Sequence, residues 1–421
     1  MSQRVMLVLP TATYRATAFL RAAEGLGLEC VVASDQAPTL AALMEGRVLT
    51  LDLGRPEDSA ARAAEFARRR PVDAVIGVDE ASVLIAAHLA TALGLARNPI
   101  EAVGATRDKR RLRARLDHAS VRQPRWVEVR GDATGSAAGT AAAAVGLPCV
   151  VKPVNLAASR GVIRANTVEE LAAAVIRVDE LLRRPELCDP DRDPPLLVEE
   201  FIPGAEIAIE GFLTEGELSV LAIFDKPDPL DGPFFAETLY VTPSRHDGAT
   251  LDDAIALTRE ALHALGLRDG PIHAELRLAR GGPVFLEVAA RSIGGRCSSA
   301  LRILDGEHEM SLEELILRHA MGMPLDQPRL APGAAGVLML PVPSTGVLHQ
   351  VSGARQAAAV PGVTAVELTI PVGQAMESLP EGDRYLGFVI ARGSDAAAVE
   401  ESLRRAQRLI GVEVEALGSG R

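Results

Sequence analysis

The sequence predicts an α/β protein of about three domains, a class that three observations support. The chain has 421 residues, whereas one domain usually has about 150, so several cores with a cleft between them are expected. Over the first 100 residues, short apolar runs alternate with helical patterns, which is typical of an open parallel sheet. Paired strands follow, and beyond Pro328 the composition shifts to Ala, Gly, Val and Pro, which indicates a small α+β domain.

The N-terminal segment begins with a strand, a helix and a second strand. The first strand is the apolar run RVMLVL at residues 4–9, and the helix over 13–25 ends at a glycine. The elements that continue this alternation are a strand at 29–34, a helix at 59–70, a strand at 73–78 and a helix at 81–93. No GxGxxG motif follows the first strand, so a dinucleotide site, and with it a dehydrogenase, is disfavoured.

The middle of the chain predicts a lobe with a loop between two strands, followed by two hairpins. A basic helix begins at Arg107, and LPCVVKPVNLAASRGV at 147–162 predicts a strand, a glycine-containing loop and a strand. The other expected elements are a strand at 126–129, a loop and helix over 131–144, a helix at 167–182, an acidic Pro-rich loop at 185–195 and a strand at 196–201. The hairpins pair 206–213 with 218–224 across Thr214, Glu215 and Gly216, and 273–278 with 283–288; a late helix is expected at 395–409.

Composition and charge exclude several classes of protein. With 48% hydrophobic and 24% charged residues, the chain has the usage of a soluble globular protein. The net charge is −12 and the basic residues are dispersed except at 107–115, so nucleic acid is not an expected partner. The N-terminal apolar run is too short for a signal peptide and no stretch is long enough for a membrane span, so a cytoplasmic protein is expected. The four cysteines have no metal-type spacing and are expected to be reduced thiols.

Lysine is rare in this chain. Of 44 basic Lys and Arg residues only three are lysines, at positions 109, 152 and 226. A compact ammonium on a flexible stem binds differently from a planar guanidinium, so each lysine marks a place where that difference could matter. The alternative is that the positions of the three lysines are due to chance.

The second hairpin, IHAELRLARGGPVFLEVAAR, is the most informative segment. If Arg280, Gly281 and Gly282 form a three-residue loop, Glu275 lies directly opposite Glu287. The alternation then places one set of residues on the core face, namely Ala274, Leu276, Leu278, Val284, Leu286 and Val288. The face with the two carboxylates also carries His273, Arg277, Phe285, Ala289 and Arg291.

Two acidic side chains directly opposite each other repel unless a cation compensates them. A divalent cation such as Mg²⁺ is commonly held by one or two carboxylates together with substrate phosphates. The alternative is a solvated hairpin face balanced by arginines. A two-residue loop would shift the register by one and separate Glu275 from Glu287.

Three further motifs support a phosphate-containing ligand. Lys152 ends an apolar strand just before the small-residue loop 155–161, where an ammonium and backbone N–H groups can hold phosphates. In LVEEFIPGAEIAIEG, exposed backbone at 200–202 can contact an adenine edge while Glu206 contacts ribose hydroxyls. In TRDKRRLRARL, Lys109 precedes an Arg-rich helix whose simpler interpretation is a solvated basic face.

Taken in this order, the segments resemble the ATP-grasp superfamily, which includes biotin carboxylase, D-alanine:D-alanine ligase and bacterial L-amino-acid ligases. The resemblance rests on the RDK segment, VVKP with its small-residue loop, EEFI with a glutamate seven residues beyond Glu199, and the HAEL/FLEVAAR hairpin. It implies a Rossmann-like pre-ATP-grasp domain at 1–105 and an ATP-grasp domain at 106–325. The latter would have a smaller lobe with a lid at 106–195 and a metal and substrate lobe at 196–325, and a small α+β domain would occupy 326–421.

The resemblance also implies roles for particular residues. Lys109 and Lys152 would contact ATP phosphates, with Ser159, Arg160 and Gly161 in the lid above them. The adenine would be held by Glu199, Glu200, Phe201 and Ile202, and the ribose by Glu206. Glu275 and Glu287 would bind Mg²⁺, or Mn²⁺ in its place, and Arg291 would stabilise the transferred phosphate, which makes Arg291, Lys152 and Glu287 the expected catalytic group. Ala289 departs from the family pattern, in which this position is often an asparagine metal ligand.

The implied activity is ATP-dependent joining of a carboxylate to an amine through an acyl phosphate, with release of ADP and phosphate. The EVAAR segment and the following Gly294 and Gly295 are more similar to the amino-acid ligase branch than to biotin carboxylase, so amino acids or small polar acids are the expected substrates. A bicarbonate-dependent carboxylase and a non-catalytic ATP-binding module remain as alternatives. A homodimer is the expectation that the resemblance gives for the oligomeric state.

Candidate substrate contacts come from three places. Lys226 and Glu237 lie in the acidic, Pro-rich segment 225–238, which is expected to be a loop that faces the substrate or the phosphates, or else a surface loop with a solvated ion pair. His273, Gly294 and Gly295 belong to the second hairpin and its extension. Finally, the ends of two N-terminal strands, where open α/β sheets bind ligands, carry Tyr14, Arg15, Asp79 and Glu80.

Overall fold

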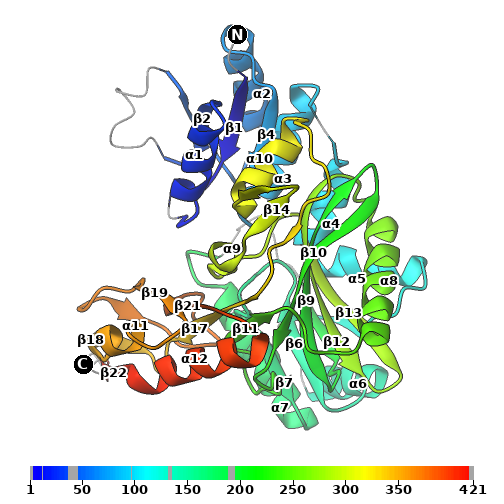
Figure 1. The fold of residues 1–421 in the computed structure, drawn as a ribbon. Helices are drawn as coiled ribbons and strands as arrows, with labels where there is room; N and C mark the ends of the chain where they lie inside the picture. The colour runs from blue at the N-terminus through cyan, green and yellow to red at the C-terminus, as the bar shows by residue number, and fades with distance from the viewer. Residues whose placement is uncertain are drawn as a thin grey trace.

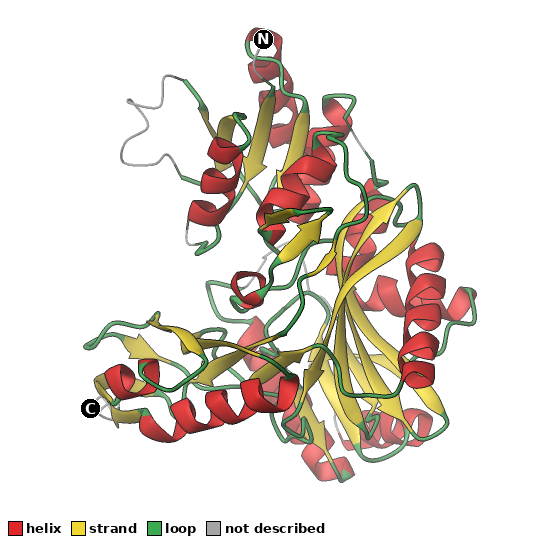
Figure 2. Ribbon diagram, viewed as in Figure 1, coloured by secondary structure: helices red, strands yellow, loops and turns green. Residues whose placement is uncertain are grey.

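The computed structural model describes residues 3–11, 13–36, 46–95, 97–130, 135–187 and 195–416. Within these ranges the chain forms a mixed α/β fold in which an N-terminal sheet, a small four-stranded sheet and a long central sheet surround a common centre (Figures 1 and 2). The predicted fold class is confirmed. Cys188 and most of the predicted loop 185–195 lie outside the described residues, as does the start of the predicted loop 131–144.

The N-terminal sheet is parallel, as predicted, because apolar strands alternate with helices that cover both of its faces. Its strands, in sheet order, are β3 (Val48–Thr50), β2 (Glu29–Ser34), β1 (Arg4–Val8) and β4 (Ala74–Gly77). Alternate side chains of β1 enter two different cores: Val5 and Leu7 pack with α1 (Ala16–Gly25), whereas Met6 and Val8 pack with α2 (Pro56–Arg69) and α3 (Val83–Ala92). Strand β3 is not among the predicted elements, because three residues are too few to show a period.

The small sheet is antiparallel and carries two helices. Its strands, in sheet order, are β5 (Trp126–Val129), β8 (Leu196–Glu200), β6 (Cys149–Pro153) and β7 (Ile163–Ala165). Helices α6 (Gly135–Val145) and α7 (Val168–Leu182) pack on it around a core of small and β-branched side chains. Thr167 caps α7 by accepting a hydrogen bond from the Glu170 N–H, which fixes the start of that helix where the sequence predicts it.

The central sheet has eight strands and continues from the second half of the chain into its C-terminal part. In sheet order they are β13 (Gly282–Ala289), β12 (Gly270–Ala279), β9 (Ala205–Thr214), β10 (Glu217–Lys226), β11 (Leu239–Thr242), β17 (Ala334–Pro341), β21 (Tyr385–Gly393) and β19 (Val363–Leu368). All neighbouring pairs are antiparallel. The sheet therefore runs without a break past position 325, and the domain boundaries inferred from the sequence remain a prediction.

Helices cover one face of the central sheet (Figure 2), and part of its other face packs against residues of the N-terminal sheet. Helices α4 (Ile100–Arg107), α5 (Lys109–His118) and α8 (Gly248–Leu265) cover β9, β12 and β13, and α12 (Ala396–Leu409) covers β17 and β21. Helix α8 is not among the predicted elements, although Leu257, Ala261 and Leu265 recur at helical spacing. The remaining elements are α9 (Cys297–Ala300), β14 (Ile303–Asp305), β15 (His308–Met310), α10 (Leu312–Ala320), β16 (Arg329–Leu330), β18 (Gly346–Ser352), α11 (Ala354–Ala358), β20 (Ala375–Met376) and β22 (Gly411–Glu415).

Both predicted hairpins form, but with shorter turns than expected. In the first, Thr214 pairs with Glu217, so the turn consists of Glu215 and Gly216 alone. Both turn residues have positive φ, 54° and 96°, the conformation that tight two-residue hairpin turns require. In the second, Ala279 pairs with Gly282, and the three-residue loops expected from the sequence are wrong in both cases.

Candidate functional site

A β-bulge in the second hairpin brings two carboxylates into register. Near its turn β12 pairs with β13 as a two-residue turn dictates, so that Leu276 lies opposite Phe285. The register then shifts by one residue, and Glu275 lies directly opposite Glu287. The predicted pairing of the two glutamates is therefore confirmed, but a bulge rather than the predicted loop produces it.

The bulge also changes which side chains face the core. Phe285 is fully buried in the cluster beneath α8 together with Leu276, Ala274 and Val288. Leu286 instead lines a cavity on the same side as Glu287. The predicted faces are thus wrong for the turn half of β13: Phe285 belongs to the core, and Val284, which pairs with Arg277, and Leu286 do not belong to that cluster.

The first of two adjoining cavities lies between the small sheet and the central sheet. It contains most of the residues predicted to bind the nucleotide and the metal, namely Lys109, Lys152, Ser159, Glu199, Glu200, Phe201, Ile202, Glu206, Glu275 and Glu287. Apolar walls come from Val150, Leu230, Phe235 and Leu286. Residues predicted from four separate segments, almost 180 positions apart, therefore meet in one cavity.

Lys152 is held by a buried carboxylate. Its Nζ lies 2.8 Å from Glu199 Oε2, and Arg113 donates to both oxygens of the same carboxylate at 2.8 and 3.1 Å. Burial opposes ionisation of Glu199, but Arg113 and Lys152 outweigh it and lower its pKa well below the usual value. Glu199 therefore orients Lys152, and its predicted contact with adenine remains a prediction.

Arg113 belongs to the candidate site, and the sequence interpretation missed it. The simpler interpretation of this segment is a solvated basic face, yet Arg113 is 1% exposed and also donates to the Leu286 carbonyl at 2.8 Å. A sequence signal existed, because Leu112, Arg113 and Leu116 occupy one helical face with Lys109, four residues before Arg113.

Lys109 joins the small-residue loop to the hairpin. Its Nζ donates to the Leu156 carbonyl at 2.8 Å and lies 3.6 Å from Glu287 Oε2, and its N–H donates to the Val154 carbonyl at 2.9 Å. Asp108 caps α5 and so fixes where the lysine stands. Of the predicted backbone contacts at 200–202, the Glu200 and Phe201 N–H groups already donate to Arg125 and Pro148 carbonyls.

The loop 155–161 lies over the point where the cavities meet, but only part of it faces them. Ala157, Ala158 and Ser159 line both cavities, and Ala158 and Ser159 have positive φ (55° and 56°), a strained backbone for residues other than glycine. Arg160 points away: its side chain donates to the Glu381 carbonyl at 2.7 Å and to Asp383 at 3.3 Å. Gly161 donates its N–H to the Pro380 carbonyl, so neither residue lines the first cavity.

Lys226 lies behind the first cavity rather than in a surface loop. It is the last residue of β10, 6% exposed, and its Nζ lies 2.6 Å from Glu206, 3.0 Å from Glu237 and 2.9 Å from Glu275. Burial lowers the pKa of the ammonium, but the three carboxylates outweigh it and raise that pKa well above its usual value. The loop begins at residue 227, two residues later than the predicted segment 225–238, and burial of Lys226 excludes a solvated ion pair.

The second cavity, of about 420 Å³, is lined by residues from both the N-terminal and the C-terminal parts of the chain as well as from its middle. It contains the predicted substrate candidates Tyr14, Asp79, Glu80, Glu237, His273, Gly294 and Gly295, together with Arg15 and Arg291. Met339, Tyr385 and Phe388 of the C-terminal part close it, and the sequence interpretation did not include them. Glu237, Glu275 and Glu287 line both cavities and therefore mark their junction.

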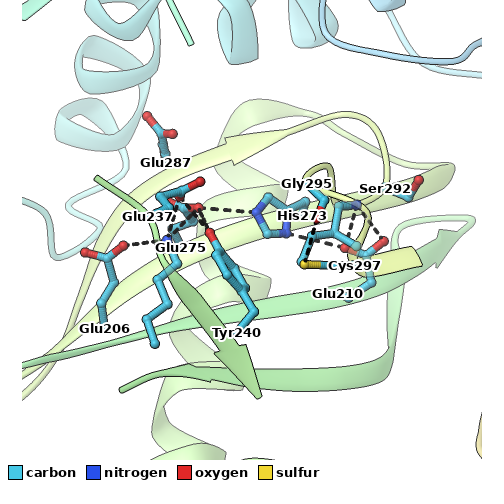
Figure 3. A network of polar contacts seen from close by, with 12 residues as sticks. Glu206, Glu210, Glu237, Tyr240, His273, Glu275, Glu287, Ser292, Gly295 and Cys297 are labelled. Carbon is cyan, nitrogen blue, oxygen red and sulfur yellow. Dashed lines mark hydrogen bonds and ion pairs between the residues drawn. The ribbon is translucent and has the colours of Figure 1, made fainter. Parts of the chain in front are cut away.

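Charged groups in the second cavity are arranged in fixed pairs. Glu80 Oε2 accepts from Arg291 Nε at 2.6 Å, and Glu80 Oε1 accepts from Arg107 at 2.7 Å. His273 lies between two carboxylates, 3.3 Å from Glu275 and 3.4 Å from Glu210 (Figure 3). Burial lowers the pKa of His273, but these carboxylates raise it to about 9, so the ring is cationic at neutral pH.

One acidic oxygen in this cavity has no partner. Asp79 Oδ1 is buried without a hydrogen bond among the described residues, and burial raises the pKa of that carboxyl group. In the same cavity, Tyr14 OH accepts from the Gly295 N–H at 2.8 Å. Gly295 has φ of 58°, a conformation that strains residues with a Cβ, and a Cβ there would displace the Met339 methyl group.

Family models match three consecutive parts of the chain: an ATP-grasp N-terminal domain at 20–96, an ATP-grasp domain at 145–300 and an L-amino acid ligase C-terminal domain 2 at 338–415. The chain belongs to the ATP-grasp superfamily. The resemblance inferred from the sequence motifs is therefore confirmed.

Relatives within the ATP-grasp superfamily include several ligases. An alanine–anticapsin ligase of Bacillus subtilis is 28% identical over 237 residues, which are 53% of this chain and 49% of that protein. A dapdiamide A synthase of Enterobacter agglomerans is 30% identical over 150 residues, 35% of this chain and 34% of that protein. The chain thus spans about half the length of the curated alanine–anticapsin ligases that it matches.

The fold is also found in solved ATP-grasp structures. An L-amino acid ligase from Bacillus licheniformis superposes with a TM-score of 0.80 at 24% identity, covering 98% of this chain and 99% of that one. A carboxyaminoimidazole ribonucleotide synthase complexed with ATP superposes with a TM-score of 0.72 at 15% identity, covering 97% and 98% of the two chains. Among the helices that the structure describes, none is long and apolar enough to cross a membrane.

Proposed function

We propose that the protein is an ATP-dependent carboxylate–amine ligase that forms an amide or peptide bond on amino acids or small polar acids and releases ADP and phosphate. The observation that carries this proposal is the carboxylate pair Glu275 and Glu287 at the junction of the two cavities. A nucleotide in the first cavity would direct its terminal phosphate to the same place that a carboxylate in the second cavity reaches. Such an arrangement suits in-line phosphoryl transfer, in which positioning and charge stabilisation supply the catalysis.

The residues at the junction fit a divalent cation, Mg²⁺ or Mn²⁺. Both side chains are hard oxygen donors, and the cross-strand register places them at adjacent positions. No cluster of three or more acidic, His or Cys side chains able to hold a metal occurs among the described residues. This agrees with a cation whose other ligands are phosphate oxygens and water, and Ala289, 8% exposed opposite His273, supplies no ligand. When bound, the cation would neutralise charge on the phosphates.

The first cavity supports a nucleotide pose. Lys109 and Lys152 are in reach of phosphates, with Ala157 to Ser159 above them, and Glu206 faces the place of a ribose. The base would lie against Phe201 and Leu286, with the Ile202 N–H as the donor that the backbone leaves free among 200–202. Arg160 and Gly161 would anchor the loop to residues 380 and 381 rather than contact the phosphates.

The proposed reaction has two steps. An oxygen of the substrate carboxylate attacks the γ-phosphorus, the bond to the ADP oxygen breaks, and an acyl phosphate forms. The amine then attacks the carbonyl carbon and phosphate leaves with the former carboxylate oxygen, while the amine loses a proton. Arg291, fixed by Glu80, lines the second cavity where the phosphate would develop charge. The covering loop 155–161 would limit hydrolysis of the acyl phosphate.

The second cavity supports a small amino acid or polar acid as substrate. Cationic Arg291 can pair with a carboxylate, and the unpartnered oxygen of Asp79 can accept from an ammonium group. Tyr14, Met339, Tyr385 and Phe388 supply an apolar wall for a side chain. The homodimer expected from the resemblance remains a prediction.

A phosphate-release screen tests the function. The purified chain is incubated with ATP and Mg²⁺ and with paired amino acids and small acids, with and without bicarbonate. Phosphate release that requires both a carboxylate and an amine supports the ligase. Release that requires bicarbonate would identify a carboxylase, and binding of ATP and Mg²⁺ with no release for any pair would identify a non-catalytic module.

The variant Glu287→Gln provides the matched control for this screen. Its side chain is 44% exposed, so the fold should remain intact and thermal unfolding should be unchanged. Phosphate release should be abolished, because the amide supplies one neutral oxygen in place of an anionic ligand. Full activity of this variant would contradict the metal assignment.

A further inference from the structure

The three carboxylates around Lys226 converge on one buried point. Figure 3 shows Glu206, Glu237, Glu275 and Tyr240 pointing toward one another from β9, the 227–238 loop, β12 and β11. Lys226 Nζ contacts one oxygen of each glutamate, at 2.6, 3.0 and 2.9 Å, and lies 4.9 Å from the centre of the Tyr240 ring. An ammonium has three N–H donors, so each donor has one carboxylate.

No other described cation reaches all three carboxylates. Arg277 Nε lies 2.9 Å from Glu206 Oε2, and His273 Nε2 lies 3.3 Å from Glu275 Oε1, but each contacts only one of them. Buried carboxylates at this separation repel one another unless a cation lies between them. An arginine at position 226 would not replace the lysine, because its donors lie in one plane on three nitrogens, whereas the three carboxylates surround a single nitrogen. The orientation of the set therefore depends on Lys226.

Each carboxylate of the set serves a different part of the site. Glu206 lines the first cavity, Glu275 lines both cavities, and Glu237 lines both and also accepts hydrogen bonds from Tyr240 OH at 2.6 Å and from Tyr385 OH at 3.2 Å. Lys226 itself lines neither of these two cavities, so it acts through the glutamates.

We infer that Lys226 is a positioning residue that holds the Glu275 carboxylate in the orientation needed to bind the cation and the Glu206 carboxylate in the orientation needed to bind the nucleotide. The inference rests on the proposed function for the identity of both ligands. With Oε1 of Glu275 committed to Lys226 at 2.9 Å and to His273 at 3.3 Å, the second oxygen is the one left for a cation at the junction. Loss of a side chain that orients a metal ligand typically weakens metal binding by about 10-fold to 100-fold.

The test compares binding and turnover in four full-length variants. Lys226→Met removes the cation, and Glu237→Gln removes one acid. The double variant K226M/E237Q removes both, so that the local net charge is kept and folding is protected. Arg245→Met is the matched control, because Arg245 also bridges two carboxylates, Asp225 and Glu400, outside both cavities. Mn²⁺ binding is measured by electron paramagnetic resonance with a non-hydrolysable ATP analogue present, and thermal unfolding reports folding.

The expected result is that K226M/E237Q unfolds cooperatively yet binds Mn²⁺ about tenfold more weakly than E237Q, and that R245M binds like the unchanged chain. In the phosphate-release assay, K226M/E237Q should need more Mg²⁺ for half-saturation and have a higher KM for ATP than E237Q. The kcat values of these two variants at saturation should differ by less than about threefold. A folded double variant with the Mn²⁺ affinity of E237Q would overturn the inference, as would absence of Mn²⁺ binding to the unchanged chain.

The binding readout separates this inference from the proposed function. If the unchanged chain binds Mn²⁺ with the ATP analogue but releases no phosphate with any substrate pair, the ligase proposal fails. The comparison of K226M/E237Q with E237Q still decides the role of Lys226 in that case.

Discussion

All three lysines of the chain lie at the candidate site, each in a different setting. Lys109 connects the covering loop with Glu287, Lys152 is held by Glu199, and Lys226 is buried among three glutamates. The chain has 41 arginines (44 basic residues minus three lysines), so a compact ammonium in place of a planar guanidinium occurs at these three positions alone. The composition alone could point to these positions, but it could not distinguish a cation that faces a ligand from one that holds other residues.

Glu80 should make stability depend on pH. Burial opposes ionisation of this carboxyl group, but Arg291 and Arg107 outweigh it and lower the pKa to about 2 from a usual 4.5. Because the folded-state pKa is the lower one, the stabilisation is present above about pH 4.5 and is lost as the pH falls toward 2. We expect Glu80→Gln to lower the free energy of unfolding at pH 7 by at most ~3 kcal/mol and by much less at pH 3.

Urea unfolding at both pH values measures this difference. Glu65→Gln serves as a control, because the Glu65–Arg69 pair is exposed on both sides and worth less than about 0.5 kcal/mol. A loss that is equal at pH 7 and pH 3 would contradict the ionic role of Glu80.

At the level of hairpins and helices, the sequence predicts the positions of most elements but not which side chains face the core near a turn. The strands β1, β2, β5 and β6 and the capped helices α7 and α12 appear where periodicity and cap residues indicate. The pairing of Glu275 with Glu287 is correct, yet the side-chain faces near the turn are not, because the bulge at Leu286 leaves no local signal. A bulge is decided by the packing of Phe285 under α8 and by the Arg113 contact to the Leu286 carbonyl, both of which are long-range.

The bulged register predicts that one of two neighbouring substitutions mainly affects stability and the other mainly affects nucleotide binding. Phe285→Ala should lower the free energy of unfolding by about 3–5 kcal/mol, because it empties a fully buried site. Leu286→Ala should cost less than about 2 kcal/mol but weaken binding of an ATP analogue, because Leu286 lines the first cavity. Urea unfolding and calorimetric titration of both variants provide the comparison, and an exchange of the two phenotypes would favour the unbulged hairpin.

Across the whole molecule, the C-terminal part completes the site in a way that the sequence did not reveal. Met339 and Phe388 line the second cavity, and Tyr385 donates to Glu237, which lies 148 positions before it in the chain. Contacts between residues so far apart leave no periodic pattern in the sequence. The composition therefore predicted a small α+β unit but not that it packs against the second cavity. The continuous sheet from β13 to β19 explains the placement, since β17 pairs with β11 beside Tyr240.

The C-terminal segment 377–383 should also hold the covering loop. Its side chains pair with Arg160, Arg177 and Arg184 through Asp383, Glu381 and Glu377. Exposed pairs are worth about 0.2–1 kcal/mol each, so the double variant Glu381→Gln/Asp383→Asn should speed amide hydrogen exchange at 155–165 by about twofold to thirtyfold. Glu309→Gln, which removes an exposed pair elsewhere, is the control, and unchanged exchange in the double variant would show that the backbone contact of Gly161 suffices.

The central claim is that a substrate carboxylate is activated by phosphoryl transfer at the junction of the two cavities. It is tested most directly by supplying a carboxylate labelled with oxygen-18, from a substrate pair that the screen identifies, and measuring the label in the released phosphate. The account predicts one labelled oxygen in phosphate for every amide bond formed, with ADP as the nucleotide product. Unlabelled phosphate accompanying amide formation, or AMP as the product, would contradict it.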